Sequence, residues 1–337
     1  MTRPRILLIS TGGTITMTRR AGSGIAPTLT AEDLVSANPE LAAIADLDVV
    51  TFSTKPGASL TLPDLIKIAV LIDRHLATGH AGAVVVQGTD TIEESAFVLD
   101  LLVQSDRPVV VTGAMRGAGA PGADGPANLL AAVTTAASGA MAGLGTMVVL
   151  NDEIHAARYV TKGDTSRPDA FVSPATGLLG RIAEGEVLRL FGVERMRPLQ
   201  RPVDASDVPV ALMRIGIGDD GRMLGALAGL GYRGAVIEAM GAGHVPDILA
   251  PLIESLADRM PVILASRTGA GPVFTRTYGF AGSEIDLIRR GAIPGGFLNG
   301  VKARLLLQLL LALGLGGDEL ARAYAMRSGP RGGAAKA

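Results

Sequence analysis

Short apolar runs that end in Gly, Ser or Thr recur along the first 150 residues. They lie at residues 5–10, 49–53, 83–87, 108–112 and 146–150. Their apolar residues are continuous rather than alternating, which is typical of strands covered on both faces in a parallel sheet. Between them, residues 62–77 and 92–103 carry apolar positions at helical spacing. This alternation predicts an α/β fold with a doubly wound parallel sheet and crossover helices.

A change of pattern near residue 190 predicts a domain boundary. Charged residues and prolines crowd into residues 190–209 with little periodicity. The α/β pattern then resumes, with strands expected near residues 210–215, 234–238 and 262–265 and helices near residues 223–231, 247–259, 299–313 and 318–326. We therefore expect a larger N-terminal domain (1–190), a linker (191–209), a smaller C-terminal α/β domain (210–327) and a disordered tail (328–337).

Composition narrows the class of partner. Hydrophobic residues make up 48% and charged residues 19% of the 337 residues, so the chain is not disordered. Lys and Arg number 31 and Asp and Glu number 32, which leaves no net field to attract a polyanion. This balance disfavours nucleic acid and an anionic membrane surface, and it favours a small-molecule partner.

Two further features bound the location and the chemistry. The apolar start of the chain is far shorter than a signal-peptide core, and residues 305–315 are about half the ~20 residues that cross a bilayer. We therefore expect a cytoplasmic protein with no membrane partner. Cysteine is absent, so a nucleophile must be Ser, Thr, Lys or a carboxylate.

Three polar clusters follow predicted strands, at the sheet edge where open parallel sheets bind ligands. They are residues 10–15, 87–94 and 112–116. Gly12 and Gly13 allow a sharp turn, and backbone amides at such strand ends can stabilise an oxyanion. A Thr hydroxyl becomes nucleophilic when a neighbour accepts its proton, and Lys162, in a predicted loop, can do this if its pKa is lowered. Together these residues indicate acyl transfer to water.

Structural explanations compete with this chemistry. The first cluster also reads as a tight turn or a phosphate-binding loop. In the second cluster, Asp90 or Thr91 can cap the next helix, and Glu93 and Glu94 suit its positive end. Helix capping gives no reason for a threonine at position 89.

These residues resemble the bacterial L-asparaginase/glutaminase family of amidohydrolases. Thr11-Gly12-Gly13-Thr14-Ile15 is similar to the first signature of the family, and Gly88-Thr89-Asp90-Thr91-Ile92-Glu93-Glu94 is similar to the second. The likeness continues through residues 113–116, 124–129, 151–152, 160–162, 266–267 and 302–308, and so covers nearly the whole chain.

The resemblance implies a two-domain enzyme that hydrolyses asparagine to aspartate and ammonia without a cofactor or metal, as a homodimer or homotetramer. It implies that Thr14 is the primary nucleophile. Thr89, Asp90 and Lys162 match a second constellation, in which Lys162 assists proton transfer and Asp90 anchors the substrate amino group.

Further residues are assigned to substrate binding by the same resemblance. Ala114 matches a main-chain contact to the leaving amide, and Glu284 matches an acidic residue that reaches the site of a neighbouring subunit. The position of the Ser that grips the substrate α-carboxylate falls near Gly57, within Gly57-Ala58-Ser59, where Ser59 or Lys55 could substitute.

The chain departs from the family pattern at three places. No Tyr occurs in residues 17–30, and Gly24 stands near the position of the Tyr that assists the nucleophile. Gln87 stands where His is usual, and Gly57 replaces the carboxylate-binding Ser. These changes leave the hydrolytic residues in place but open the possibility of a related amide as the substrate.

Three other functions remain as alternatives. One is a hydrolase of a related, non-standard amide. Another is a catalytically silent small-molecule binder of the same fold, which the missing Tyr and Ser allow. A nucleotide- or phosphate-binding module ranks below both, because Gly12-Gly13-Thr14 lacks the third Gly of that motif and residues 49–53 end without an acid.

Overall fold

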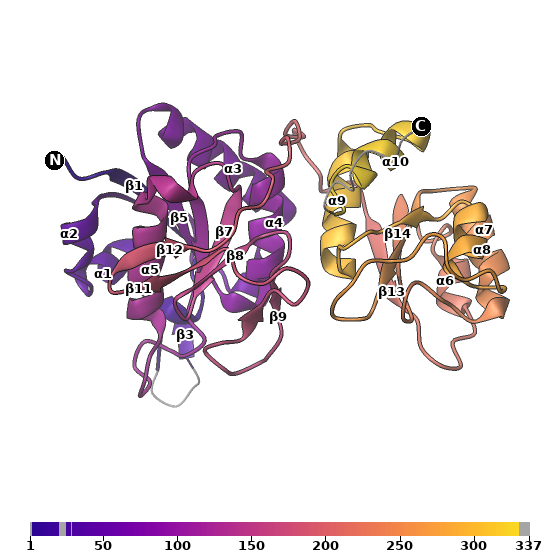
Figure 1. The fold of residues 1–337 in the computed structure, drawn as a ribbon, viewed down its shortest axis with the longest axis horizontal. Coiled ribbons are helices and arrows are strands. Elements are labelled where there is room, and N and C mark those ends of the chain that lie inside the picture. The colour runs from indigo at the N-terminus through magenta and orange to yellow at the C-terminus, as the bar shows by residue number, and fades with distance from the viewer. Residues whose placement is uncertain (1, 20–24, 28, 330–337) are drawn as a thin grey trace. The chain divides into compact units, whose positions relative to one another are not determined.

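A computed structural model describes residues 2–19, 25–27 and 29–329, and the chain divides into two compact units, Met1–Leu199 and Gln200–Ala337 (Figure 1). The division falls within residues 191–209, which contain no helix or strand. The exact limits of the two domains and of the linker stay a prediction. Among the described residues, no helix has the length and apolar character that crossing a bilayer requires.

The N-terminal unit is built on an eight-stranded sheet in the order β12-β11-β8-β7-β6-β5-β1-β4. Its parallel part contains β1 (Arg5–Ser10), β4 (Asp46–Thr51), β5 (Gly82–Val86), β6 (Val109–Thr112) and β7 (Thr146–Leu150). These are the five strands predicted from the apolar runs. Strand β4 begins three residues earlier than predicted because Asp46 pairs with Arg5 in the register of β1.

The sheet is mixed rather than wholly parallel, which corrects one part of the prediction. Strands β8 (Glu153–Ala156), β11 (Gly180–Ala183) and β12 (Glu186–Arg189) extend it with antiparallel pairing. Two-residue turns at residues 151–152 and 184–185 reverse the chain, and all four turn residues have positive φ. Such turns match the twist of paired strands and so permit direct antiparallel neighbours.

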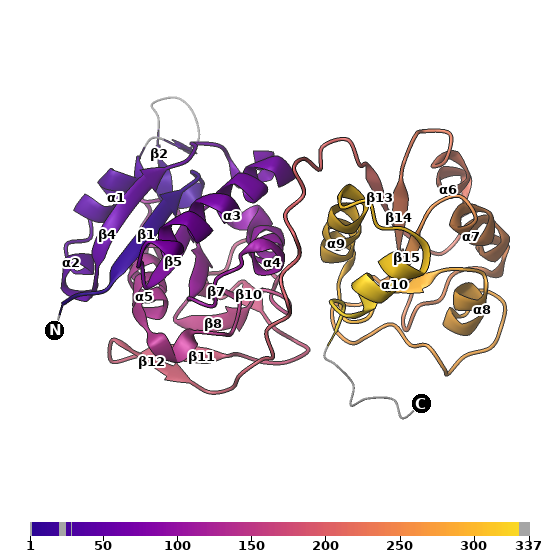
Figure 2. The same ribbon diagram turned by 90° about the horizontal axis from the view of Figure 1, so that it is seen from above.

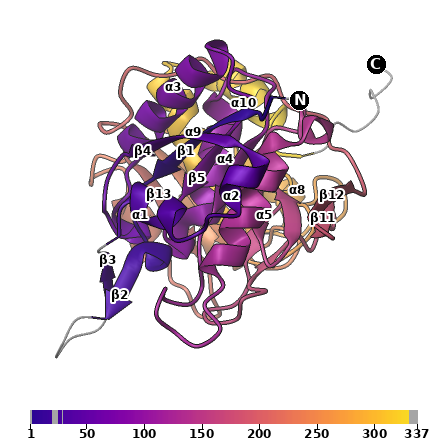
Figure 3. The same cartoon turned by 90° about the vertical axis from the view of Figure 1, so that its left-hand side faces the viewer.

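Helices cover both faces of this sheet (Figure 2). On one face lie α3 (Leu62–Ala77) and α4 (Ile92–Leu102), and on the other lie α1 (Ala31–Ser36), α2 (Leu41–Ile44) and α5 (Gly125–Ala137). Figure 3 shows this layering from the side, with α3 above strands β4, β1 and β5 and α1 below them. Helix α3 begins with a capping box, in which Thr61 and Asp64 satisfy each other's backbone N–H groups.

Several short elements stand at the ends of the parallel strands. These are the 3-10 helices η1 (Thr14–Thr16), η2 (Gly57–Ser59) and η3 (Thr89–Thr91) and the paired strands β2 (Met17–Arg19) with β3 (Ile25–Pro27) and β9 (Thr161–Lys162) with β10 (Phe171–Val172). A further 3-10 helix, η4 (Gly139–Met141), precedes β7. The predicted site residues of this unit therefore lie on or beside short, tightly turned segments.

The C-terminal unit is a smaller α/β domain with a four-stranded parallel sheet, as predicted. Its order is β13 (Val210–Arg214), β14 (Gly234–Ala239), β15 (Val262–Ser266) and β16 (Ile293–Pro294). Helix α9 (Gly300–Ala312) packs on one face with α10 (Gly317–Ala325) beside it. Helices α6 (Arg222–Ala226), α7 (Ala250–Ala257, preceded by η5 at Asp247–Leu249) and α8 (Glu284–Arg289) cover the other face (Figure 1).

Two expectations for this unit differ from the structure. The helix predicted over residues 223–231 ends at Ala226, and glycine-containing turns follow, with Gly231 at φ +81°. The predicted tail begins too early, because Ser328 is buried and its carbonyl accepts a hydrogen bond from Phe297 N at 2.6 Å. Residues 330–337 lie outside the described residues.

Candidate active site

Loops that follow three neighbouring strands meet at the carboxyl edge of the N-terminal sheet. A Cβ on Gly13, after β1, would lie 2.1 Å from Gly88 N, after β5. A Cβ on Gly57, after β4, would lie 2.8 Å from Gly88 O. Only glycine allows backbones to approach this closely, so the three loops are in main-chain contact. Thr14 directly follows Gly13, and Thr89 directly follows Gly88.

Hydrogen bonds between the strands hold this arrangement. Thr11 N donates to Val86 O at 2.9 Å, and Ser53 Oγ donates to Thr11 O at 3.0 Å. Thr91 Oγ1 donates to Gly57 O at 3.0 Å, which ties the loop after β5 to the loop after β4. The prediction that Asp90 or Thr91 caps the next helix is wrong, because neither 3-10 helix η3 nor helix α4 has a side-chain cap among the described residues.

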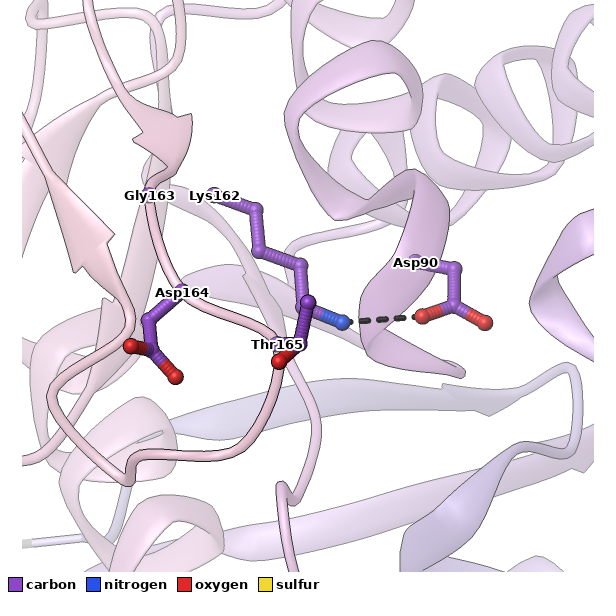
Figure 4. A pocket seen from close by; sticks show the side chains of 5 residues that line it. All are labelled: Asp90, Lys162, Gly163, Asp164 and Thr165. Atoms are coloured by element: carbon purple, nitrogen blue, oxygen red, sulfur yellow. Dashed lines mark hydrogen bonds and ion pairs between the residues drawn. The ribbon is translucent and has the colours of Figure 1, made fainter.

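Lys162 joins this edge from a distant part of the chain. Its Nζ donates to Thr89 Oγ1 at 3.0 Å. It also donates to Asp90 Oδ1 at 2.8 Å, the bond drawn in Figure 4. The Thr89 residue is 5% exposed, whereas the side chains of Lys162 and Asp90 are 15% and 71% exposed. The structure therefore brings together the three residues of the predicted second constellation, with one carboxylate open to solvent.

An open pocket of about 300 Å³ adjoins this ion pair. It is lined by Asp90, Lys162, Gly163, Asp164 and Thr165 (Figure 4). The Asp164 carboxylate accepts hydrogen bonds from the backbone N–H groups of Ser166 and Arg167, which hold its pKa below the ordinary value. Asp164 is thus a structural acceptor of its own loop, and Lys162 and Asp90 are the other charged residues that line the pocket.

Thr14 and Ala114 lie at the same edge of the sheet. Thr14 is half-buried and begins η1, and it is not among the residues that line the pocket beside Lys162. Ala114 follows β6 and is fully buried. The start of α5 touches both loops, because a Cβ on Gly125 would lie 2.8 Å from Ile15 Cγ1 and 3.5 Å from Ala114 Cβ. Gly24, which stands near the position of the Tyr that assists the nucleophile in the family, lies outside the described residues.

The loop of residues 55–59, predicted to bind the α-carboxylate of the substrate, presents few side chains that could bind an anion. Gly57 is buried, while Ala58 and Ser59 are exposed. Lys55 Nζ forms an ion pair with Asp64 Oδ2 at 2.8 Å. Burial alone would raise the pKa of Asp64, but Lys55 and Thr61 together hold it below its ordinary value. Lys55 is therefore engaged at the start of α3.

Gln87, which stands where the family pattern has His, has a bridging position. Its Nε2 lies 3.3 Å from both Gly88 O and Thr91 Oγ1, while its buried Oε1 has no hydrogen-bond partner among the described residues. Gln87 and Thr91 thus brace the loop that carries Thr89 and Asp90. Neither was predicted as a site residue, although both flank Gly88-Thr89-Asp90 and Gln87 departs from the family pattern.

Glu284 belongs to the C-terminal unit, at the start of α8. Its carboxylate is fully buried and accepts from Thr277 N at 2.9 Å and Tyr278 N at 2.7 Å, with His244 Nε2 at 3.3 Å. Burial alone would raise the pKa of Glu284, but the two backbone N–H groups hold it below the ordinary value. Its predicted reach toward a neighbouring subunit stays a prediction.

No cluster of three or more His, Cys, Asp or Glu residues able to hold a metal ion occurs within residues 2–19, 25–27 and 29–329. The described residues of the candidate site supply hydroxyls, an ammonium and a carboxylate.

Comparison with known proteins gives a consistent result over both units. Residues 5–191 match the model of the asparaginase N-terminal domain, and residues 209–324 match that of the glutaminase/asparaginase C-terminal domain. The chain is 40% identical over 331 residues to a probable L-asparaginase of Deinococcus radiodurans, covering 95% of this chain and 97% of that protein. It is 36% identical over 318 residues to an L-asparaginase of Bacillus licheniformis, covering 91% and 95%.

A solved structure agrees with this relationship. The crystal structure of a probable cytoplasmic L-asparaginase from Campylobacter jejuni superposes with a TM-score of 0.85 at 30% identity, covering 96% of this chain and 99% of that one. Both domain models, the full-length relatives and the fold point the same way, and this chain belongs to the L-asparaginase family.

Proposed function

We propose that this protein is an L-asparaginase that hydrolyses L-asparagine to L-aspartate and ammonia. The observation that carries the proposal is the Lys162 ammonium bonded to both Thr89 Oγ1 and Asp90 Oδ1 at the edge of the parallel sheet. The near full-length likeness to proteins named L-asparaginase supports the choice of substrate.

In the proposed reaction, Thr14 Oγ loses its hydroxyl proton as it attacks the side-chain carbonyl carbon of asparagine. The C–N bond of the tetrahedral intermediate breaks, the leaving nitrogen takes up one proton in place of the one that Thr14 lost and departs as ammonia, and an ester on Thr14 remains. Water then cleaves this ester, which releases aspartate and restores the hydroxyl. Backbone amides at the glycine-rich strand ends are suited to stabilise the oxyanion of both tetrahedral species.

Thr89 and Lys162 are proposed to assist the transfer of the proton from the Thr14 hydroxyl to the leaving nitrogen. Because Lys162 donates to Thr89 Oγ1, the hydroxyl hydrogen of Thr89 is left to point elsewhere, toward a substrate oxygen or a water molecule. Lys162 also forms an ion pair with Asp90, whose carboxylate is exposed and available to accept the substrate ammonium.

A second candidate substrate is an amide that lacks the α-carboxylate of asparagine. The observation that favours it is the packing of Gly57, where any side chain would meet Gly88 O at 2.8 Å. The loop cannot hold a hydroxyl at this position without moving, and Lys55 is paired with Asp64. An α-carboxylate would then depend on exposed Ser59 or on backbone N–H groups.

We also propose that the protein acts in the cytoplasm and assembles as a homodimer or homotetramer. The cytoplasmic location is supported by the Campylobacter jejuni structure, which is named a probable cytoplasmic L-asparaginase. A 34%-identical relative in Haemophilus influenzae is named a probable periplasmic L-asparaginase, so both locations occur among similar proteins.

The test is ammonia release from L-asparagine, L-glutamine, D-asparagine and 3-aminopropanamide, the asparagine analogue without its α-carboxylate. We expect L-asparagine to be turned over, with losses of about 10²–10⁴-fold in Thr14→Ala and Thr89→Ala. Thr134→Ala is the matched control, because its hydroxyl donates to Leu130 O within α5.

Each outcome decides one point. Full activity of Thr14→Ala on L-asparagine would end the nucleophile assignment. Turnover of 3-aminopropanamide at a rate above that of asparagine would support the second candidate. No turnover of any amide by the wild type would leave a catalytically silent binder.

A further inference from the structure

A buried asparagine on α5 links two loops at the carboxyl edge of the sheet. Asn128 is 2% exposed and lies in the first turns of the helix. Its Nδ2 donates to Gly113 O at 3.0 Å, after β6, and its Oδ1 accepts from Asn151 N at 2.8 Å, after β7. One side chain thus uses its donor and its acceptor to fix the ends of two adjacent strands.

A second side chain at the start of α5 completes this network. The Asp124 carboxylate accepts from Met115 N and from Arg116 N, both at 2.9 Å. It also accepts from Asn128 Nδ2 at 3.1 Å. The main chain of residues 113–116 is therefore held at both ends by side chains that come from one helix.

This loop in turn packs against the proposed proton-handling residue. A Cβ on Gly113 would lie 3.3 Å from Thr89 Cγ2 and 2.5 Å from Gln87 O. The backbone of Gly113 thus forms one wall of the space that the Thr89 side chain occupies. Thr89 on its other side accepts from Lys162 Nζ at 3.0 Å.

We propose that Asn128 is a positioning residue for the reaction, acting through Gly113 on the orientation of Thr89 toward Lys162. This inference rests on the proposed function. Asparagine suits the position because it offers both a donor to a carbonyl and an acceptor to an N–H. An aspartate would set a carboxylate against Gly113 O and beside Asp124, and a leucine would remove both bonds.

The test compares Asn128→Asp and Asn128→Leu with Thr135→Val. Thr135 is a matched control because it is buried on the same helix and its Oγ1 donates to Ala131 O at 2.8 Å, within the helix. The measurements are kcat and KM for L-asparagine, the thermal midpoint, and amide hydrogen exchange over residues 113–116.

We expect both Asn128 variants to lower kcat by about 10–100-fold with little change in KM, since a small misplacement of a reacting group costs about this much. Exchange at Met115 and Arg116 should become faster in both. Thr135→Val should lower the thermal midpoint and leave kcat and the exchange of this loop unchanged. Asn128→Asp, which has the same shape as the wild-type residue, carries the test if the leucine variant does not fold.

Two results would overturn the proposal. One is an Asn128→Asp protein that keeps the kcat of the wild type. The other is unchanged exchange over residues 113–116, which needs no turnover and would remove the link between Asn128 and the loop. A wild-type protein that releases no ammonia from asparagine would instead contradict the proposed function, and the exchange experiment would still decide whether Asn128 holds the loop.

Discussion

Gly13 and Gly79 have nearly the same backbone conformation, with φ of +94° and +100°, in very different surroundings. A Cβ on Gly13 would lie 2.1 Å from Gly88 N, whereas one on Gly79 would have no atom of the described part of the chain within 4 Å. Alanine at Gly79 meets only left-handed strain, which costs about 1–2 kcal/mol. At Gly13 it must also push apart the loops that carry Thr14 and Thr89.

We therefore expect Gly79→Ala to lower the free energy of unfolding by about 1–2 kcal/mol and to keep full activity. Gly13→Ala should lose about 1–3 kcal/mol more, the usual cost of overpacking, and most of its ammonia release. Urea denaturation and the ammonia assay measure the two effects. Equal losses of stability and of ammonia release in the two variants would show that close contact between the loops is not needed for stability or activity.

His155 is a buried residue whose titration should appear in the stability of the protein. Burial lowers its pKa from 6.5 to about 4. Its Nδ1 lies 3.0 Å from Ser173 Oγ. Glu153 Oε2 lies 3.6 Å from Nε2, beyond hydrogen-bond distance, and the same carboxylate is paired with Arg181. The folded protein therefore holds His155 neutral where an unfolded chain would bind a proton.

Between pH 6.5 and about 4 the unfolded state binds more protons at this residue, so the stability contributed by neutral His155 is lost as the pH falls. The wild type should lose up to about 3 kcal/mol across this window relative to His155→Gln. Urea denaturation at pH 7, 6, 5 and 4 measures this, with half-buried His75→Gln as the control. A constant difference between wild type and His155→Gln at all four pH values would contradict the expectation.

Among the elements, those with a strong local pattern were predicted and those that depend on distant contacts were not. The continuous apolar runs that form β1, β5, β6 and β7 are buried along almost their whole length. Strand β12 (Glu186–Arg189) has no fully buried residue and pairs only with β11, so its sequence has no alternation to detect. Its turn, Glu184-Gly185, also lacks the Asn-Gly or Asp-Gly pair that marks most hairpins.

The candidate site shows the same division. Glycines and threonines after apolar strands marked the loops of Thr14 and Thr89, because strand ends of a parallel sheet share one edge. The pairing of Lys162 with Thr89 spans 73 residues. Side-chain chemistry suggested a Thr–Lys pair, and the family resemblance indicated that the threonine is Thr89. Asn128 lay within a stretch that resembles the family, but no role was assigned to it, since its role depends on Gly113 and Asn151 arriving beside α5.

At the scale of the whole molecule, a working site can draw its residues from one chain or from two. The proposed reactive residues lie in the N-terminal unit, whereas Glu284 lies in the C-terminal unit, buried against Thr277 and Tyr278. The family resemblance predicts that Glu284 serves a neighbouring subunit. In that case a site needs residues from two copies, and two different defects can be repaired by mixing them.

Coexpression of Thr89→Ala and Glu284→Gln with different affinity tags tests this prediction. Glutamine keeps an oxygen that can accept from Thr277 N and Tyr278 N, so the fold should persist. Each variant alone should release little ammonia from asparagine. In a hybrid dimer one site carries both changes and the other carries neither, so purified hybrids should regain about half of the wild-type activity. Hybrids no more active than the two parents would place the function of Glu284 within its own chain, because shared sites necessarily regenerate one intact copy.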